Sequence, residues 1–331
     1  MAFPGSGGPN FFEQLLGDLM KVMGGAASGS GRVDMARTMA QQLASSGEPE
    51  GNVDPAERIA FEQLAPVAEL HVTEITGLAV TASGAPVEVT AVSPGQWAWH
   101  TVDDWRFLLD AMSASPPEPP GKEPRPGQAG SPAGSARDVE DDSAFAGTDL
   151  EPGAGGADML ARYMASLAPM LAAIQLGQAV GHLGRATLGP YEIPIPRPAP
   201  RLIVVPANVV RFAEAWSLPP DEVRLWVCLR EEALQAVLLR PPVAERIHDL
   251  LLAVVHGAAA DAGDMLGRLQ GAFDPSDPTS LQRMFGDDPG SLFEMTPSPD
   301  RARDVADLTA VMAAILGFTE HVLDRAAERL L

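Results

Sequence analysis

Residues 208–238 read NVVRFAEAWSLPPDEVRLWVCLREEALQAVL, and this stretch decides how the chain is expected to fold. Pro219 and Pro220 separate two segments that contain no glycine or proline of their own. The first segment predicts a helix over Ala207–Trp216. The second predicts a helix over Pro220–Leu239, with proline at its first position. We expect the second helix to be central and buried, through an apolar face of Val223, Trp226, Val227, Leu234 and Leu238.

Three charged residues, Arg230, Glu231 and Glu232, interrupt this otherwise apolar helix. A buried charge is tolerated only when it is paired, so at least one of the three should be buried in an ion pair. The single cysteine, Cys228, lies between apolar neighbours and is expected to be a small core residue.

Helical periodicity extends over most of the remaining chain. A hairpin or extended loop is expected at Leu78–Val92 and an extended stretch at Tyr191–Pro206. The fold is therefore predicted to be mainly α with little sheet. The other predicted helices are Phe11–Val22, Asp34–Ser46, one that begins at Asp54 and is kinked or divided at Pro66, one that begins near Thr101, Asp158–Leu188, Val243–Val255, Ala262–Leu269, Thr279–Phe285 and Arg301–Leu331.

Residues 113–156 differ in composition from the rest, because Pro, Gly, Ser and acidic residues leave nothing that could form a core. They predict a disordered linker or a long surface insertion, which is better read as a tether than as a ligand for a partner's groove. The predicted organisation is an N-terminal helical region (1–112), this linker (113–156) and a second helical region (157–331), with the two helical regions packed as one globular unit.

The charge balance limits the partners that the protein can have. Lys and Arg number 23 and Asp and Glu number 44, which gives a net charge of −21. Such a surface repels phosphate backbones, so nucleic acid and anionic membranes are not expected partners. The lone cysteine excludes an intrachain disulfide, and the first residues do not form a secretory signal, so a cytoplasmic location is expected.

One uncharged run, Tyr163–Gly184, is long enough to cross a bilayer. It contains Pro169, two glutamines and a histidine, and it is rich in Ala and Gly instead of Leu and Ile. A buried core helix is the better interpretation, and no membrane span is expected. A membrane-associated protein that uses this run remains a third hypothesis for function.

No residue pattern by itself identifies an active site. The phosphate-binding, dinucleotide-binding and nucleophile-elbow motifs are absent, and no two of the six histidines have metal-ligand spacing. His321 with Glu320 and Asp324 is the one compact group, and a solvated helix face explains it more simply than a metal.

Residues 208–238 resemble the active-site segment of the zincin-like metallopeptidases of high-GC Gram-positive bacteria, one branch of which is associated with deazaflavin-cofactor biosynthesis. The family pattern is approximately P-N-x-x-x-F-A-x-x-W-x-L-P-x-x-E-V-R-L-W-V-A-L-H-E-x-A-H-x-A. Further segments resemble other parts of the family: 31–44, 60–78, 93–105, 172–196, 277–299 and 308–331. The positions that match within the pattern are Asn208, Phe212, Ala213, Trp216, Leu218, Pro219, Glu222, Val223, Arg224, Leu225, Trp226, Val227, Leu229, Glu231, Ala233 and Ala236.

The departures from the family pattern fall on the zinc ligands that the resemblance implies. The two histidines of HExxH bind zinc from one helix face, and the Glu between them polarises the metal-bound water. Here Arg230 and Leu234 stand at the two histidine positions, and Gln235 follows them. Leu316 stands where the family is expected to supply a third ligand, a Glu. Only Glu231, the general-base position, is retained, so no metal or other cofactor is expected.

Two functions therefore compete with the membrane hypothesis. The first is a catalytically inactive homologue that serves as a scaffold or binding module for an unknown protein or peptide. The second is an active metal-dependent hydrolase or peptidase with a relocated site, in which His182, His248, His256 or His321 converge with acidic residues. Family members often continue beyond the point that matches Leu331, so this copy is expected to be shortened relative to its relatives.

Overall fold

The computed structural model describes residues 29–47, 50–113, 155–198, 201–272 and 298–330. The predicted helices Phe11–Val22 and Thr279–Phe285 lie outside these residues, as does almost all of the predicted linker 113–156. The described part is mainly helical with little sheet, as the sequence predicted.

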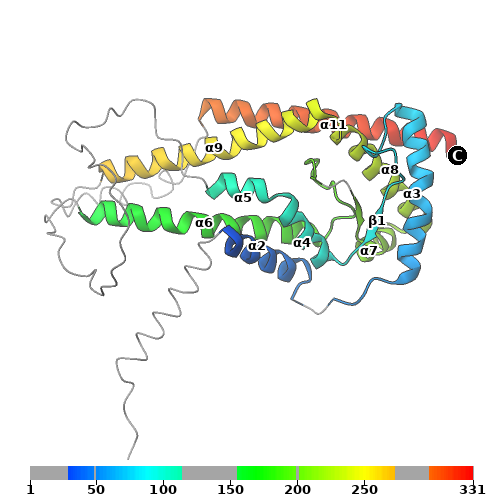
Figure 1. Cartoon of the computed structure of the whole chain (residues 1–331), viewed down its shortest axis with the longest axis horizontal. Helices are drawn as coiled ribbons and strands as arrows, with labels where there is room; N and C mark the ends of the chain where they lie inside the picture. Colours follow the sequence, from blue (N-terminus) through cyan, green and yellow to red (C-terminus); the bar gives the residue numbers. More distant parts are fainter. Residues whose placement is uncertain (1–28, 48–49, 114–154, 199–200, 273–297, 331) are drawn as a thin grey trace, which may run out of the picture.

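The described residues form helices and a single pair of short strands. Figure 1 shows α9 and α11 side by side, α5 between α9 and α6, and α3 beside α8 at the far end of these long helices. The elements are α2 (Gly29–Ala44), α3 (Pro55–Thr76), β1 (Val89–Ala91), α4 (Pro94–Asp104), α5 (Arg106–Ser113), α6 (Gly155–Gly184), β2 (Leu202–Val204), α7 (Pro206–Trp216), α8 (Pro220–Leu238), α9 (Pro241–Ala272) and α11 (Pro299–Leu330).

The two strands form a parallel pair, with Thr90 opposite Ile203. Of the two alternatives predicted for Leu78–Val92, the structure has the extended loop and not the hairpin, because β1 takes its partner from a segment that follows more than a hundred residues later. Parallel strands require such a crossover connection. The pair therefore joins the first part of the chain to the segment that leads into α7.

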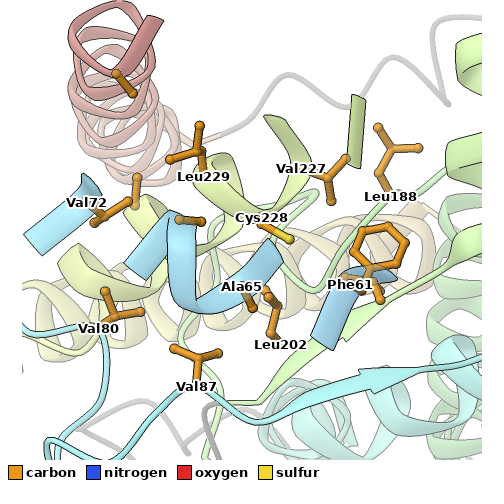
Figure 2. Close-up of a cluster of buried hydrophobic side chains, with 14 of the residues drawn as sticks. Phe61, Ala65, Val72, Val80, Val87, Leu188, Leu202, Val227, Cys228 and Leu229 are labelled. Carbon is orange, nitrogen blue, oxygen red and sulfur yellow. The ribbon is translucent and has the colours of Figure 1, made fainter. Parts of the chain in front are cut away.

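The largest core cluster lies between α3 and α8. Asp54 caps α3 by accepting a hydrogen bond from the N–H of Ala56, and Pro55 occupies the first helical position, as predicted. Pro66 does not divide α3, which is continuous to Thr76. In Figure 2, side chains of α3 and α8 meet around Cys228, which is buried as expected.

A second core cluster is formed by α2, α4 and α6. The helix expected near Thr101 begins earlier, at Pro94, because Ser93 and Gln96 form a reciprocal capping box there. It ends at Asp104, and α5 follows directly.

α9 and α11 complete the fold and pack on each other. The sequence predicted separate helices at Val243–Val255 and Ala262–Leu269, but α9 runs without a break from Pro241 to Ala272. Gly257 does not interrupt it and lies instead against Arg301 of α11, where an added Cβ would be 3.2 Å from the Arg301 Cβ.

One helix of the described residues is long and apolar enough to cross a membrane by length and composition alone. It is α11, where the qualifying window is 17% buried. A single helix that meets these criteria is weak evidence for a span.

Candidate functional site

The segment between α6 and β2 positions the region around Glu231. The amide of Asn208 donates to the carbonyls of Gly184 and Thr187 at 3.0 and 2.7 Å. The Gly189 carbonyl accepts from the indole N–H of Trp97 at 3.0 Å and from the Thr187 hydroxyl at 2.8 Å. These buried bonds hold the backbone that follows Thr187 in one place, against the middle of α8.

Glu231 is fully buried where this segment meets α8. One carboxylate oxygen accepts a hydrogen bond from the Tyr191 N–H at 2.8 Å, and the other is paired with the guanidinium of Arg230. Gly189 lies directly against this carboxyl group, because an added Cβ would be 2.4 Å from the Glu231 Cδ. Only glycine leaves room for Glu231 there.

This environment leaves Glu231 little capacity for general-base catalysis. Burial raises the pKa of Glu231, while the Arg230 charge and the Tyr191 N–H act in the opposite direction. Both oxygens already have partners, and none of the side chain is exposed. A general base must reach a substrate or a water molecule, and this carboxyl group is enclosed by its own chain.

Leu234, one turn further along α8, is also fully buried. Its contacts are apolar and come from the segment after α6 and from α8, α9 and α11; the buried members of the cluster are Tyr191, Leu234, Leu238, Ile247 and Ile315.

The third inferred ligand position, Leu316, does not lie in this cluster. Its neighbour Ile315 is the buried α11 residue of the Leu234 cluster, while Leu316 is 37% exposed. The structure therefore brings Arg230, Glu231 and Leu234 together and leaves Leu316 at the surface. The position after Leu234, Gln235, is buried and donates to the Val80 carbonyl at 2.9 Å, so it anchors the segment that follows α3.

Glu232 is a second fully buried carboxyl group, next to Glu231 but on another side of α8. Neither of its oxygens has a hydrogen-bond partner among the described residues, and the Gln235 side-chain oxygen also has none there. Burial, with a contribution from the Glu69 charge on α3, raises the pKa of Glu232 to about 9. Glu232 is therefore protonated, and neutral, at pH 7.

A sequence profile of the zincin-like metallopeptidases matches residues 32–331. The chain belongs to this family. A search among solved structures finds a protein of Chloroflexus aurantiacus, provisionally described as a hydrolase with a novel fold, at 12% identity and a TM-score of 0.38. The match covers 86% of this chain and 79% of the other. Comparison with curated protein sequences gave no match.

The zinc ion that membership of the zincin-like family implies does not fit the residues that this family member has at the site. A guanidinium, an aliphatic side chain and a carboxyl group already paired with that guanidinium offer no open ligand set. Among the described residues of this zincin-like protein, no group of three or more His, Cys, Asp or Glu side chains could hold a metal ion. The four histidines considered for a relocated site, His182, His248, His256 and His321, are all exposed, on α6, α9 and α11.

The expected buried ion pair on α8 is confirmed for Glu231 and Arg230. The burial of Glu232 without a partner was not predicted. The signal for it was the run of three adjacent charges on one helix, which could not all reach solvent or a partner. Trp226 was expected to be buried but is 38% exposed.

Proposed function

We propose that this chain is a catalytically inactive zincin-like metallopeptidase homologue that acts as a binding module for a protein or peptide. The observation that carries the proposal is the buried pair of Glu231 and Arg230, which places a cation where the family pattern has a zinc ligand. Arginine stays protonated and cannot coordinate a metal ion.

The packing around Leu234 supports the same proposal. A second ligand position is filled by an aliphatic side chain, which belongs to a core cluster with four other buried residues. Replacing it by a hydrated metal ligand would open this apolar cluster. The interior at this position therefore forms an apolar core where a metal ion would otherwise bind. This is consistent with a protein that functions through its surface.

The alternative, a hydrolase with a relocated site, requires ligands that converge elsewhere. The described residues contain no group of three candidate ligands, and the four histidines are spread over three helices. No observation favours this alternative, although it makes a distinct prediction about metal content.

Zinc content of the purified, tag-cleaved full chain is the decisive measurement. The protein is stripped with a chelator, loaded with zinc, dialysed and analysed by plasma mass spectrometry. We expect less than about a tenth of an equivalent of bound zinc, since a structural or catalytic site holds close to one. The same preparation is expected to show no zinc-stimulated cleavage of casein.

The matched variant is Arg230→His combined with Leu234→His, which restores two imidazoles four residues apart on one helix face. Its zinc content should exceed that of the unmodified chain, while Leu234→Met, which keeps an apolar side chain, should retain none. A full equivalent of zinc in the unmodified chain that resists dialysis would overturn the proposal and favour a relocated site.

A further inference from the structure

Two of the five tryptophans are exposed next to each other, where α7 turns into α8. Trp216 is 68% exposed and Trp226 is 38% exposed, whereas Trp97 and Trp105 are buried. A large aromatic side chain in water loses the free energy that its burial would provide. Trp216 and Trp226 therefore form a surface that is incomplete in the isolated chain.

The remaining exposed tryptophan, Trp99, has a different environment from Trp216 and Trp226. The Arg37 guanidinium lies over the Trp99 ring at 4.7 Å from its centroid, so this indole already has a cationic neighbour from its own chain. The interactions of Trp216 and Trp226 among the described residues are instead with one aromatic ring, that of Phe212.

Phe212 and Trp226 line a small pocket, and Trp216 lies against Phe212 beside it. Phe212 packs on the main core and lies parallel to Trp226, at 6.2 Å between ring centroids and 5° between planes. Trp216 is tilted against the same ring, also at 6.2 Å. A cavity of about 330 Å³ is lined by Phe212, Leu218, Glu222, Val223 and Trp226.

The pocket is rigid at its base and open above. Val223 is only 4% exposed and belongs to the main core, so it holds the floor in place. Leu218, on the connection between α7 and α8, is 44% exposed and forms an outer wall. An apolar side chain from a partner would be buried there without rearrangement of the core, which lowers the cost of binding.

The negative charge at the pocket indicates which kind of partner would bind there. Glu222 lines the pocket, and its side chain is exposed. Its carboxylate makes no ion pair with any residue that the structure describes. A lysine or arginine brought beside the aromatic rings would interact with this carboxylate and with the ring faces.

We propose that the pocket between α7 and α8 binds a peptide segment of a partner protein that presents an aliphatic or proline side chain next to a lysine or arginine. This inference rests on the proposed binding-module function and names the surface that performs it. The Glu222 carboxylate and the net charge of −21 disfavour an anionic membrane, and a second copy of this chain would bring another net charge of −21 to the same surface.

The test uses the immobilised full chain and a phage-displayed random peptide library. Enriched peptides are synthesised and titrated against the chain by fluorescence anisotropy. We expect the selected sequences to share an apolar residue adjacent to lysine or arginine. Trp216→Ala and Trp226→Ala should each weaken binding at least about tenfold, as for aromatic residues at the centre of an interface.

Two further variants separate contact from fold and charge from shape. Trp99→Ala removes an exposed indole elsewhere and should leave the affinity unchanged. Glu222→Gln preserves the shape of the pocket and should both weaken binding and reduce its dependence on salt concentration.

The proposal is overturned if the selected peptides lack basic residues or bind the tryptophan variants as tightly as the unmodified chain. It is also overturned if these variants lose instead the binding of phosphatidylglycerol vesicles, or a dimer seen by sedimentation velocity. Zinc content of the same preparation keeps the two proposals separate: zinc-free protein that binds no peptide through Trp216 and Trp226 overturns the docking site alone.

Discussion

Glu231 and Glu232 are adjacent, fully buried carboxyl groups on α8, and burial raises the pKa of both. For Glu231, the Arg230 charge and the hydrogen bond from the Tyr191 N–H act against this rise. Glu232 has no partner for either oxygen among the described residues and faces the repulsion of Glu69. A buried carboxyl group in this situation avoids the desolvation cost by staying protonated.

Glu232 should therefore make the stability of the protein depend on pH. Its pKa is about 9 in the folded chain, against 4.5 for an unperturbed glutamate. A raised pKa in the folded state stabilises the fold fully below pH 4.5, and this contribution is lost as the pH rises toward 9. Each unit of difference corresponds to about 1.4 kcal/mol, so the loss amounts to several kcal/mol.

The variant Glu232→Gln, which keeps the shape but cannot ionise, should be more stable than the unmodified chain at pH 8. The difference should shrink toward zero near pH 4.5, where both chains carry a neutral side chain at this position. Urea unfolding at several pH values measures it, and a difference that does not change with pH would contradict the assignment to Glu232. Glu69→Gln is the companion variant, and it should reduce the pH dependence.

At the scale of elements, α2 and α6 approach closely because α6 has glycines on the facing side. An added Cβ at Gly177 would be 2.7 Å from the Ala36 carbonyl oxygen, and one at Gly181 would be 2.6 Å from the Leu43 Cβ. The facing positions on α2 are Ala36 and Ala40, neither of which is exposed. Small residues on both helices allow their backbones to come near each other.

Gly181→Ala should destabilise the protein, because the new methyl group has no space between two fixed backbones. We expect a loss of about 1–3 kcal/mol, the usual cost of overpacking a core. Gly317→Ala is the matched control, since Gly317 is an exposed glycine inside α11 with no atom within 4 Å of an added Cβ. That change should stabilise by about 0.5–1 kcal/mol, from helix propensity alone. Thermal unfolding of both variants measures these changes in stability. Equal changes for Gly181→Ala and Gly317→Ala would exclude close packing as the cause.

At the scale of the molecule, several elements join the part of the chain up to residue 113 to the part that begins at residue 155. α2, α4 and α5 pack on α6, and α5 also packs on α9. α3 packs on α8 and α11, and β1 pairs with β2. The largest core cluster and the second core cluster both contain side chains from the two regions. Each region alone would expose the apolar face that it buries against the other.

Cutting the chain between the two regions should therefore leave them associated. A protease site inserted within residues 114–154 is cleaved, and the product is examined by gel filtration and thermal unfolding. We expect both fragments to elute together and to unfold in one transition, because the contacts that join them do not depend on the connection. Separation of the fragments without denaturant would show that the two regions are independent domains. The unmodified chain treated with the same protease is the control.

Much of the fold could be predicted from the sequence, because helix periodicity and end signals are local. The start of α3 could be predicted from Asp54 and Pro55. The helices α7 and α8 could be predicted from the apolar patterns on either side of Pro219 and Pro220. The buried ion pair on the helix of Arg230 and Glu231 was also predictable from residue types, whereas the inferred ligand positions came from the family resemblance. These features depend on a few neighbouring residues.

Only the tertiary structure decided which distant residues meet. The pairing of β1 with β2, the packing of Ile315 in place of Leu316 against Leu234, and the continuity of α9 depend on contacts that periodicity cannot rank. The same holds for Trp226, because an apolar side chain on a buried helix is exposed when no neighbouring element covers that position. The sequence by itself determined the helices, and through the family resemblance it predicted that the metal-ligand positions are substituted. The partners of each buried or exposed side chain were decided by how the helices pack.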